Sequence, residues 1–343
     1  MLLREQVPLA PYTTFGIGGP ARWLVEATDE ESVAEAVKFA REKSAPLFVL
    51  GGVSNLLVSD HGFPGVVLHI AIKGIQQEGS LFHVAAGENW DAFVSRAIED
   101  DFGGIECLAG IPGTVGGTPV QNVGAYGQEV SSTIVSVLVF DRNDFTFCDL
   151  PASACGFSYR SSIFNSTHRE RFIVTRVTYE LQPQAIPALQ YPDLKRYFKD
   201  HQETPTLAET ASAVREIRHR KGMLLVDGDS DCRSAGSFFK NPIVPQARYD
   251  AVAATASSSV PSYPAQTGFV KIPAAWLVEH SGFQKGFALG AAGISSRHTL
   301  ALINRGGATA AEILALRDLI VSTVEKKFAI RLEPEPVWVD QAS

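Results

Sequence analysis

The spacing of apolar residues predicts a chain in which helices and strands alternate. Apolar positions three and four residues apart predict helices over residues 28–43, 89–101, 206–221 and 309–328. Short runs rich in β-branched and aromatic residues predict strands at 46–50, 66–70, 81–85, 133–140 and 172–181. Three of the helices begin with a capping box, in which Thr is followed three residues later by Glu: Thr28 and Glu31, Thr206 and Glu209, Thr309 and Glu312.

Other segments have weaker patterns. Residues 183–205 hold four prolines and little periodicity, which predicts a long connection and a domain boundary. Residues 251–260 are small and polar and predict a surface loop. Residues 276–279 predict part of a short buried helix, and residues 299–303 predict a strand.

Residues 110–127 differ from the rest of the chain because six of these eighteen positions are glycine and none is charged, where average usage gives about one glycine. A segment with so little side-chain bulk can expose consecutive backbone N–H groups as a concave nest for an anion such as a pyrophosphate. Pro112 and Pro119 stiffen the path, so the segment is not a flexible linker. A tight loop that only turns a corner between strands explains the composition equally well.

A second glycine turn follows the strand predicted at 46–50. Gly51 and Gly52 lead into Val53, Ser54 and Asn55, which makes this turn a further candidate phosphate site. It lacks the G-x-G-x-x-G spacing of a dinucleotide-binding motif and the Lys-Ser/Thr pair of a P-loop. Taken alone, it is better interpreted as a plain turn.

Two groups of cations could face an anion. Arg160 lies among aromatic and small polar residues, where a guanidinium is pre-organised for a carboxylate or phosphate, although an exposed arginine at a strand end is the simpler interpretation. The helix predicted at 206–221 ends with Arg215, Arg218, His219, Arg220 and Lys221. Cations at a helix C-terminus complement the helix dipole, which explains most of them, and one or two could also face a diphosphate.

Two later segments carry polar groups in unusual surroundings. Residues 234–242 read S-A-G-S-F-F-K-N-P, and neither a nucleophile elbow nor an evident histidine partner activates Ser237. Near the C-terminus, Glu333 and Glu335 lie two positions apart, so an extended chain points both carboxylates to the same side. Pro334 and Pro336 interrupt any regular ladder there.

Composition narrows the class of protein. The 343 residues are 45% hydrophobic, enough for two domains with large cores. A formal charge of −7 and a pI of about 5.7 argue against a nucleic-acid or anionic-membrane surface, so an anionic ligand must be held by local donors. The four cysteines show no metal-ligand spacing and fit reduced thiols. With no signal-peptide core and no apolar run of about 20 residues, we expect a cytoplasmic protein that holds no metal.

Eight short segments in order carry a family resemblance. They are P-Y-T-T-F-G-I at 11–17, L-G-G-V-S-N-L at 50–56, A-G-E-N-W at 86–90, I-P-G-T-V-G-G at 111–117, Q-N-V-G-A-Y-G at 121–127, Y-R at 159–160, A-G-S-F-F-K-N-P at 235–242 and L-E-P-E at 332–335. Together they resemble the UDP-N-acetylenolpyruvoylglucosamine reductases, the MurB flavoenzymes of peptidoglycan synthesis. Tyr191 resembles the substrate-capping tyrosine of the type I form of that family.

The resemblance implies an α+β fold. An FAD-binding domain would span residues 1–205, as two α/β sub-domains at about 1–70 and 71–205 with the PCMH-like flavin fold. A smaller α/β substrate-binding domain would span residues 206–330. Residues 331–343 would form a tail that returns to the active site.

The resemblance also implies the reaction. Non-covalent FAD would be held by backbone amides of the glycine segments, and NADPH would be the co-substrate that reduces the enolpyruvyl ether of UDP-N-acetylglucosamine to UDP-N-acetylmuramate. The expected partners are therefore this sugar nucleotide and NADPH, with no nucleic acid and no membrane, and the protein is expected to be a monomer.

The resemblance assigns residues position by position. Ser237 matches the proton donor, and Arg160 and Glu335 match the pair at the enolpyruvyl carboxylate. The positions expected to bind FAD are Gly51, Gly52, Ser54, Asn55, Ile111, Pro112, Gly113, Thr114, Gly116, Gly117, Asn122, Gly124, Ala125, Tyr126, Gly127 and Ile173. The positions expected at the substrate are Tyr159, Tyr191, Lys221, Asn241, Tyr263 and His298.

Two other classes of protein remain open from the sequence. One is a different flavoenzyme with the same FAD-binding domain, such as an alcohol oxidase. The other is a non-catalytic protein that binds a nucleotide sugar.

Overall fold

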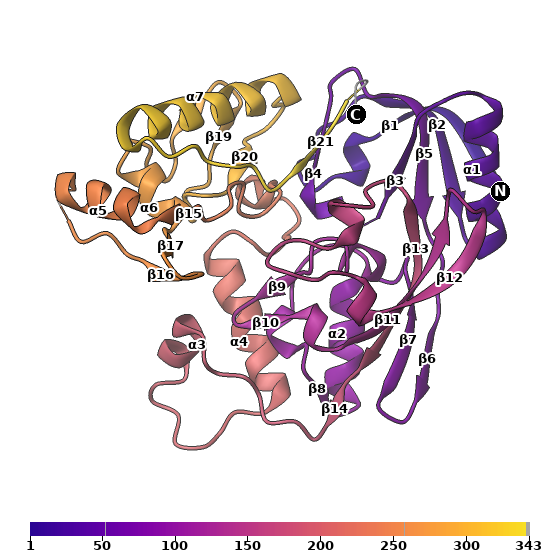
Figure 1. The fold of residues 1–343 in the computed structure, drawn as a ribbon, viewed down its shortest axis with the longest axis horizontal. Helices are drawn as coiled ribbons and strands as arrows, with labels where there is room; N and C mark the ends of the chain where they lie inside the picture. The colour runs from indigo at the N-terminus through magenta and orange to yellow at the C-terminus, as the bar shows by residue number, and fades with distance from the viewer. Residues whose placement is uncertain (52, 257, 341–343) are drawn as a thin grey trace. The chain divides into compact units, whose positions relative to one another are not determined.

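The computed structural model describes residues 1–51, 53–256 and 258–340, which form two compact units (Figure 1). The first unit consists of Met1–Val7, Pro20–Val53 and Phe63–Arg220. The second consists of Pro8–Gly19, Ser54–Gly62 and Lys221–Ser343. Two short N-terminal segments thus belong to the unit that is built mainly from the C-terminal part of the chain.

The first unit begins with a four-stranded sheet in the order β1-β2-β5-β3. Strands β2 (Pro20–Ala27) and β3 (Leu47–Leu50) both pair in parallel with β5 (Phe63–Ile70), and β1 is Leu2–Pro8. Helix α1 (Glu30–Glu42) buries the predicted apolar face against this sheet. Its N-cap is Asp29, whose side chain accepts from Ser32 N–H. The capping box predicted at Thr28 is therefore wrong by one residue, because Asp29 is itself a strong N-cap.

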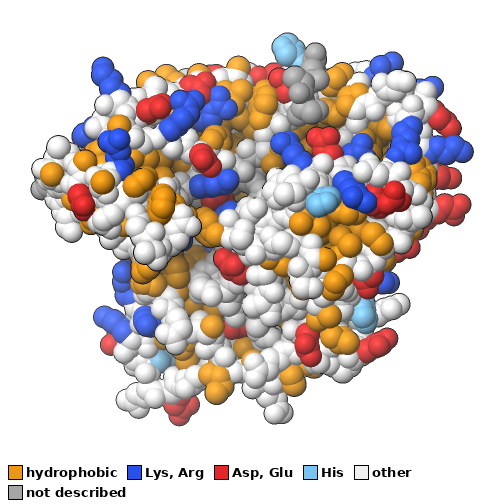
Figure 2. Space-filling view, viewed as in Figure 1, with side chains coloured by type: hydrophobic (Ala, Val, Ile, Leu, Met, Phe, Trp, Pro, Cys, Tyr) orange, Lys and Arg blue, Asp and Glu red, His pale blue; other side chains and the backbone are white. Residues whose placement is uncertain are grey.

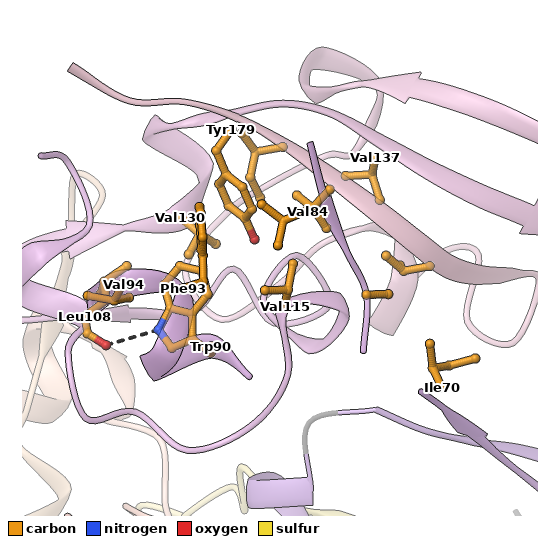
Figure 3. Packing of buried hydrophobic residues seen from close by; sticks show 14 of the residues in the cluster. Ile70, Val84, Trp90, Phe93, Val94, Leu108, Val115, Val130, Val137 and Tyr179 are labelled. Atoms are coloured by element: carbon orange, nitrogen blue, oxygen red, sulfur yellow. Dashed lines mark hydrogen bonds between the residues drawn. The ribbon is translucent and has the colours of Figure 1, made fainter. Parts of the chain in front are cut away.

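A five-stranded sheet in the order β12-β11-β13-β7-β6 forms the rest of the first unit's framework. Its pairings are antiparallel, and one register row places Val137, Val177 and Val84 side by side across three strands. Figure 3 shows Val84 and Val137 with the aromatic rings of helix α2. The strands are β6 (Ile75–Glu78), β7 (Leu81–Ala85), β11 (Ile134–Asp141), β12 (Thr146–Pro151) and β13 (Phe172–Glu180).

Helix α2 (Trp90–Glu99) supplies the aromatic centre of this core. The Phe93 ring lies 5.2 Å from the ring of Tyr179 and 5.9 Å from that of Trp90, in tilted and edge-on contacts that stabilise aromatic pairs. Trp90 Nε1–H donates to the carbonyl of Leu108, so this buried indole nitrogen is satisfied (Figure 3). Trp90 therefore fixes the segment that leads into the glycine-rich stretch.

Shorter elements complete the first unit. Helix α3 (Pro192–Tyr197) lies within the connection that the prolines predicted, and α4 (Leu207–Arg220) follows with the predicted capping box of Thr206 and Glu209. The remaining strands are β8 (Phe102–Gly103) with β14 (Gln182–Pro183), and β9 (Gly124–Ala125) with β10 (Gln128–Glu129).

The second unit is a small α/β unit built on two three-stranded antiparallel sheets. Helix α7 (Ala310–Phe328) contributes the predicted apolar stripe to its core. The strands are β15 (Ile243–Pro245), β16 (Tyr263–Pro264), β17 (Phe269–Lys271), β18 (Ala288–Leu289), β19 (Ala292–Ile294) and β20 (Leu302–Asn304), and the other helices are α5 (Gln246–Thr255) and α6 (Ala274–Glu279). The C-terminal strand β21 (Val337–Val339) pairs in parallel with β4 (Leu56–Val58).

The structure corrects two predictions here. The surface loop predicted at 251–260 is wrong, since α5 continues to Thr255, and Val252 and Val260 are buried. Alanine is the strongest helix former, and the lack of an apolar stripe hid the helix. The strand predicted at 299–303 begins later, at Leu302.

The surface is mixed in charge. On the face shown in Figure 2, acidic and basic side chains are interspersed rather than gathered into one patch. Among the described residues, no helix has the length and apolar content to cross a bilayer, and no cluster of His, Cys, Asp and Glu has the makings of a metal site.

The N-terminus of α7 is stabilised twice, which gives a prediction for folding stability. Thr309 and Glu312 form the capping box, and Asp60 accepts from the next two amides, Ala310 N–H at 2.8 Å and Ala311 N–H at 3.0 Å. We expect Asp60→Ala to lower the free energy of unfolding by about 1 kcal/mol, because two helix donors and a favourable charge at the dipole lose their partner.

Urea unfolding measures this change. Asp318→Ala is the matched control, since Asp318 lies in the same helix with an exposed side chain paired to Arg317, and it should change stability by less than about 0.5 kcal/mol. Equal effects of the two substitutions would contradict the capping role of Asp60.

Candidate functional site

The glycine-rich stretch lies very close to neighbouring backbone of the first unit. Val115 N–H donates to the Glu88 carbonyl at 2.9 Å, and Gly116 N–H donates to the Ala86 carbonyl at 2.8 Å. A Cβ on Gly116 would lie 2.6 Å from the Cβ of Ala86, so a side chain does not fit there. Tight packing therefore accounts for the glycine at position 116. The amides of Val115 and Gly116 both form hydrogen bonds inside the protein.

Thr114 gives the stretch an unsatisfied polar atom. Its Oγ1 is buried and has no hydrogen-bond partner among the described residues. A Cβ built on Gly51 would lie 4.0 Å from this oxygen and 4.0 Å from the backbone nitrogen of Gly117. A buried hydroxyl without a partner costs about 1–3 kcal/mol, so a bound water or a ligand with a hydrogen-bonding group would stabilise this position. Gly51, Thr114 and Gly117 thus lie close together, and the Gly117 N–H donates to the Thr114 carbonyl at 3.0 Å. Gly52 lies outside the described residues.

A buried arginine adjoins the start of the stretch. Arg218 of α4 is 6% exposed, and its Nε donates to the Gly110 carbonyl at 3.0 Å. Burial lowers the pKa of this guanidinium, while Tyr126 and Asp91 oppose that shift. Asp91 accepts from Gly110 N–H at 2.6 Å and from Arg215 Nη2 at 2.7 Å. Two of the cations at the end of α4 thus contact the first residue of the glycine-rich stretch. Arg218 binds the Gly110 carbonyl directly, and Arg215 acts through Asp91, which accepts from Gly110 N–H.

Tyr126 and Gly127 form the turn between β9 and β10. Both have positive φ, 49° and 88°, as the central positions of a type I′ turn require. Tyrosine is rare in this conformation, so the fold holds Tyr126 against a local preference. Burial raises the pKa of the Tyr126 hydroxyl to about 12, and Arg218 is its hydrogen-bond partner. The ring of Tyr191 lies 5.3 Å from the Tyr126 ring, edge to face, which places one predicted substrate residue beside a predicted cofactor residue.

Arg160 occupies a strained turn. Ser161 N–H donates to the Ser158 carbonyl at 3.1 Å, with Tyr159 and Arg160 between them, and Arg160 has φ of 56°. Glycine or asparagine is usual at this third position of the turn. The guanidinium Nη2 donates to the Gly124 carbonyl at 2.7 Å, and its carbon lies 5.6 Å from the Tyr159 ring centre. Because backbone strain is often kept at functional sites, the turn points to a role for this side chain.

In the second unit, Ser237 has a histidine partner. His298 Nε2 lies 3.3 Å from Ser237 Oγ. Burial lowers the pKa of His298 to about 4, with smaller contributions from the charges of Lys221 and Lys285. The imidazole is therefore neutral near pH 7. The sequence showed no such partner, because 61 positions separate the two residues.

The C-terminal tail pairs with the segment that carries Ser237. Lys240 N–H donates to the Glu333 carbonyl at 2.9 Å, and Glu335 N–H donates to the Phe238 carbonyl at 2.8 Å. Asn55 Nδ2 donates to the Glu335 carbonyl at 3.0 Å. These bonds place Glu335 beside the residue that follows Ser237, as two extended segments hydrogen-bonded to each other.

The other predicted residues have varied surroundings. Asn122 is 1% exposed, and its side chain bonds Glu129, Ser158 and Ser131, so it organises the loop from inside. Asn241 Oδ1 accepts from Ala274 N–H at 2.9 Å, and the Tyr263 side chain is exposed on β16. Gly124 and Ala125 form β9, Ile173 is buried in β13, and Ile111, Pro112 and Gly113 are half-buried. Ser54 lies in the short 3-10 helix Val53–Asn55, and Lys221 follows α4.

The predicted catalytic residues belong to different units of the structure. Ser237 and Glu335 lie together in the second unit, whereas Arg160 belongs to the first. The meeting of all three over a substrate stays a prediction.

Sequence reasoning missed the roles of Arg218 and Asp91. A signal for Arg218 was present, since Leu207, Ala211, Val214 and Arg218 are spaced as one buried helix face. An arginine at an apolar-stripe position predicts a buried cation with partners.

Two family models match the chain. The C-terminal domain of UDP-N-acetylenolpyruvoylglucosamine reductase matches residues 228–339. An FAD binding domain matches residues 21–144, the part that holds Gly51, Thr114 and Gly117.

Relatives resemble the chain over nearly its whole length. The UDP-N-acetylenolpyruvoylglucosamine reductases of Streptomyces avermitilis and Thermobifida fusca are 45% and 43% identical to it; each alignment covers 98% of this chain, and 94% and 97% of the respective relative. The crystal structure of UDP-N-acetylenolpyruvylglucosamine reductase (MurB) from Thermus caldophilus is 27% identical, with a TM-score of 0.70 and coverage of 99% of this chain and 100% of that one. The predicted α+β fold with a flavin-binding domain is thereby confirmed, and the chain belongs to the UDP-N-acetylenolpyruvoylglucosamine reductase family.

Proposed function

We propose that this chain reduces UDP-N-acetylenolpyruvoylglucosamine to UDP-N-acetylmuramate, with FAD as cofactor and NADPH as reductant, in the synthesis of cell-wall peptidoglycan. The observation that carries the proposal is the pairing of the Ser237 segment with the C-terminal tail through Glu335 N–H and the Phe238 carbonyl. This pairing places Ser237 and Glu335, which both lie in segments that match the family, on neighbouring backbone segments.

The residues of the first unit fit FAD. Gly51, Thr114 and Gly117 offer a site with an unsatisfied hydroxyl, and Gly116 lets the chain approach where a side chain would block it. When bound, reduced FAD supplies a hydride to the enolpyruvyl double bond. The Thr114 hydroxyl would hold the diphosphate, together with backbone amides other than those of Val115, Gly116 and Gly117, which bond within the protein.

The chain's own residues then manage charge and protons. Arg160 would stabilise the negative charge that develops on the substrate carboxylate, because a fixed cation needs no reorganisation during the reaction. Ser237 Oγ would donate the proton that completes the reduction. Glu335 would contact the same carboxylate, and Tyr159, Tyr191, Lys221, Asn241 and Tyr263 would bind the rest of the substrate.

The wider assignments belong to the same proposal. Residues 1–205 would bind FAD, 206–330 would bind substrate, and the tail from 331 would complete the active site. The protein would act as a monomer in the cytoplasm, where its four free thiols would stay reduced.

NADPH oxidation with and without the enolpyruvyl substrate tests the function, and Ser237→Ala tests the proton donor. We expect this variant to reduce FAD with NADPH at nearly the normal rate but to reduce substrate about 10²-fold more slowly, the scale of a lost general acid. Stopped-flow absorbance of the flavin measures the two half-reactions separately.

Ser281→Ala is the control, because that hydroxyl donates to the Leu277 carbonyl within the same unit. Equal loss in both half-reactions of Ser237→Ala would reject the proton-donor role. Rapid reoxidation by oxygen without the enolpyruvyl substrate would favour an oxidase, and no NADPH turnover would favour a non-catalytic binder.

A substitution at the strained turn of Arg160 should affect catalysis much more than folding stability. Arg160→Gly relieves the positive φ and loses the bond to the Gly124 carbonyl, so the free energy of unfolding should change by less than about 1 kcal/mol. Substrate reduction should fall about 10²-fold or more, since the cation is lost. Urea unfolding and stopped-flow kinetics measure the two effects, with Arg160→Lys as the charge-preserving variant. Unchanged substrate reduction in Arg160→Gly would refute the assigned role.

The unsatisfied hydroxyl of Thr114 gives a prediction for FAD binding. Thr114→Val should leave the FAD-free protein as stable as before or slightly more so, and should weaken FAD binding about 10-fold, the value of one hydrogen bond to a charged group. Calorimetric titration with FAD measures the affinity.

Thr118→Val is the contrasting variant, because the Thr118 hydroxyl lies 2.7 Å from the Tyr179 hydroxyl and donates to the Val115 carbonyl. It should destabilise the FAD-free protein. A Thr114→Val protein that binds FAD normally would show that this hydroxyl does not contact the cofactor.

A further inference from the structure

The loop that carries His298 is fastened to the segment that carries Ser237. Phe238 N–H donates to the Leu300 carbonyl at 2.8 Å, one residue beyond Ser237 and two beyond His298. This backbone bond fixes the register of the two segments. The 3.3 Å separation of Ser237 Oγ and His298 Nε2 is therefore set by the main chain as well as by the side chains.

A carboxylate also anchors the same loop. Asp231 accepts from Ser296 N–H at 2.9 Å, from Ser295 Oγ at 2.8 Å and from Arg297 Nε at 2.8 Å. Burial opposes its ionisation, but these bonds hold the pKa of Asp231 below its usual range. Ser295 Oγ also accepts from His298 N–H at 3.2 Å, so the backbone of His298 is tied to this anchored network.

The hydrogen bonds of His298 determine its tautomer. Leu300 N–H donates to His298 Nδ1 at 3.3 Å, and a backbone N–H has no acceptor role. Nδ1 therefore carries no proton, and the neutral ring carries its proton on Nε2. Nε2–H then donates to Ser237 Oγ. The serine hydroxyl is left with one hydrogen, which must point away from the histidine.

We propose that His298 is a positioning residue for Ser237. The Ser237 hydroxyl accepts a hydrogen bond from His298 Nε2–H, and the serine proton is thereby directed toward the substrate. This inference rests on the proposed function and goes beyond the substrate-binding role that the family resemblance implies for His298. It explains how a hydroxyl, a weak acid in water, is prepared as a donor.

The proton balance is simple. The Oγ–H bond of Ser237 breaks and a C–H bond forms at the substrate carbon that bears the negative charge. The electron pair of the broken bond stays on Oγ, where Nε2–H of His298 stabilises it by a charge-assisted hydrogen bond. Water then returns a proton to Oγ, so each turnover takes one proton from solvent.

The surrounding charges favour this arrangement. Burial opposes the protonation of His298, and the charges of Lys221 and Lys285 add to this effect, so its pKa is lowered to about 4. Asp229 and Asp231 both form ion pairs with Arg297 of the anchored loop. A protonated ring would carry a hydrogen on Nδ1 that faces Leu300 N–H. We therefore expect the contribution of His298 to substrate reduction to be lost only as the pH falls toward 4.

The experiment compares His298→Gln with His298→Leu. The glutamine amide can donate from a position close to that of Nε2, whereas leucine cannot donate. We expect NADPH-dependent reduction of FAD to be normal in both variants. Substrate reduction should slow about 10-fold or more in His298→Leu but stay within about threefold in His298→Gln, and the acidic limb near pH 4 should disappear in His298→Gln.

His280→Leu is the matched control. His280 belongs to the same unit and forms a similar pair, with Nε2 3.1 Å from Ser258 Oγ, so its loss should leave both half-reactions unchanged. If His298→Gln is as slow as His298→Leu while both fold, as judged by urea unfolding, the positioning role is overturned.

A double-mutant cycle with Ser237→Ala separates positioning from substrate contact. If His298 acts through Ser237, His298→Leu adds no further loss in the Ser237→Ala background. An equal rise in KM in both backgrounds would overturn the proposal and assign His298 to the substrate. Full activity of Ser237→Ala would instead overturn the proton-donor assignment in the proposed function, whatever the His298 variants show.

Discussion

Close approach of backbone at the glycine-rich stretch is the constraint on which the first unit depends. Gly116 lies so near Ala86 that a Cβ has no room, and the amides of Val115 and Gly116 reach the carbonyls of Glu88 and Ala86 across that narrow gap. The packing fixes where Thr114 lies, and Thr114 is left with a buried hydroxyl that the described protein does not satisfy. The same packing that stabilises the loop therefore leaves a buried polar atom that, in the proposed function, bonds to FAD.

In the second unit, hydrogen bonds between segments that are distant in sequence fix the position of the backbone around Ser237. The tail bonds to Phe238 and Lys240, the loop of His298 bonds to Phe238, and Asn55 bonds to the tail. Ser237 thus lies on backbone that is held by two partners. The proposed role of Ser237 as a proton donor requires such a fixed geometry, because proton transfer depends steeply on position.

Several non-glycine residues near the site have left-handed backbone. Tyr126 and Arg160 have φ of 49° and 56°, which costs each of them about 1–3 kcal/mol relative to an ordinary conformation. Their side chains make contacts that glycine could not, Tyr126 with Tyr191 and Arg218, and Arg160 with Gly124 and Tyr159. Local preference is overruled at these positions, which is where function is expected to overrule it.

Most helices and strands were predictable because periodicity and capping are local properties. The Thr309–Glu312 capping box and the apolar stripe of α7 lie within one helix, so the chain carries that information itself. Helix α5 was missed because the small residues of its second half form no apolar stripe. Family motifs in the sequence assigned Ser237, Arg160 and Glu335, and these roles remain predictions. Tertiary structure alone decided that Ser237 meets His298, that Arg218 is buried beside Gly110, and that Thr114 has an unsatisfied hydroxyl. Those facts depend on contacts between segments as far as 108 positions apart, and a contact of that kind leaves no periodic trace in either segment.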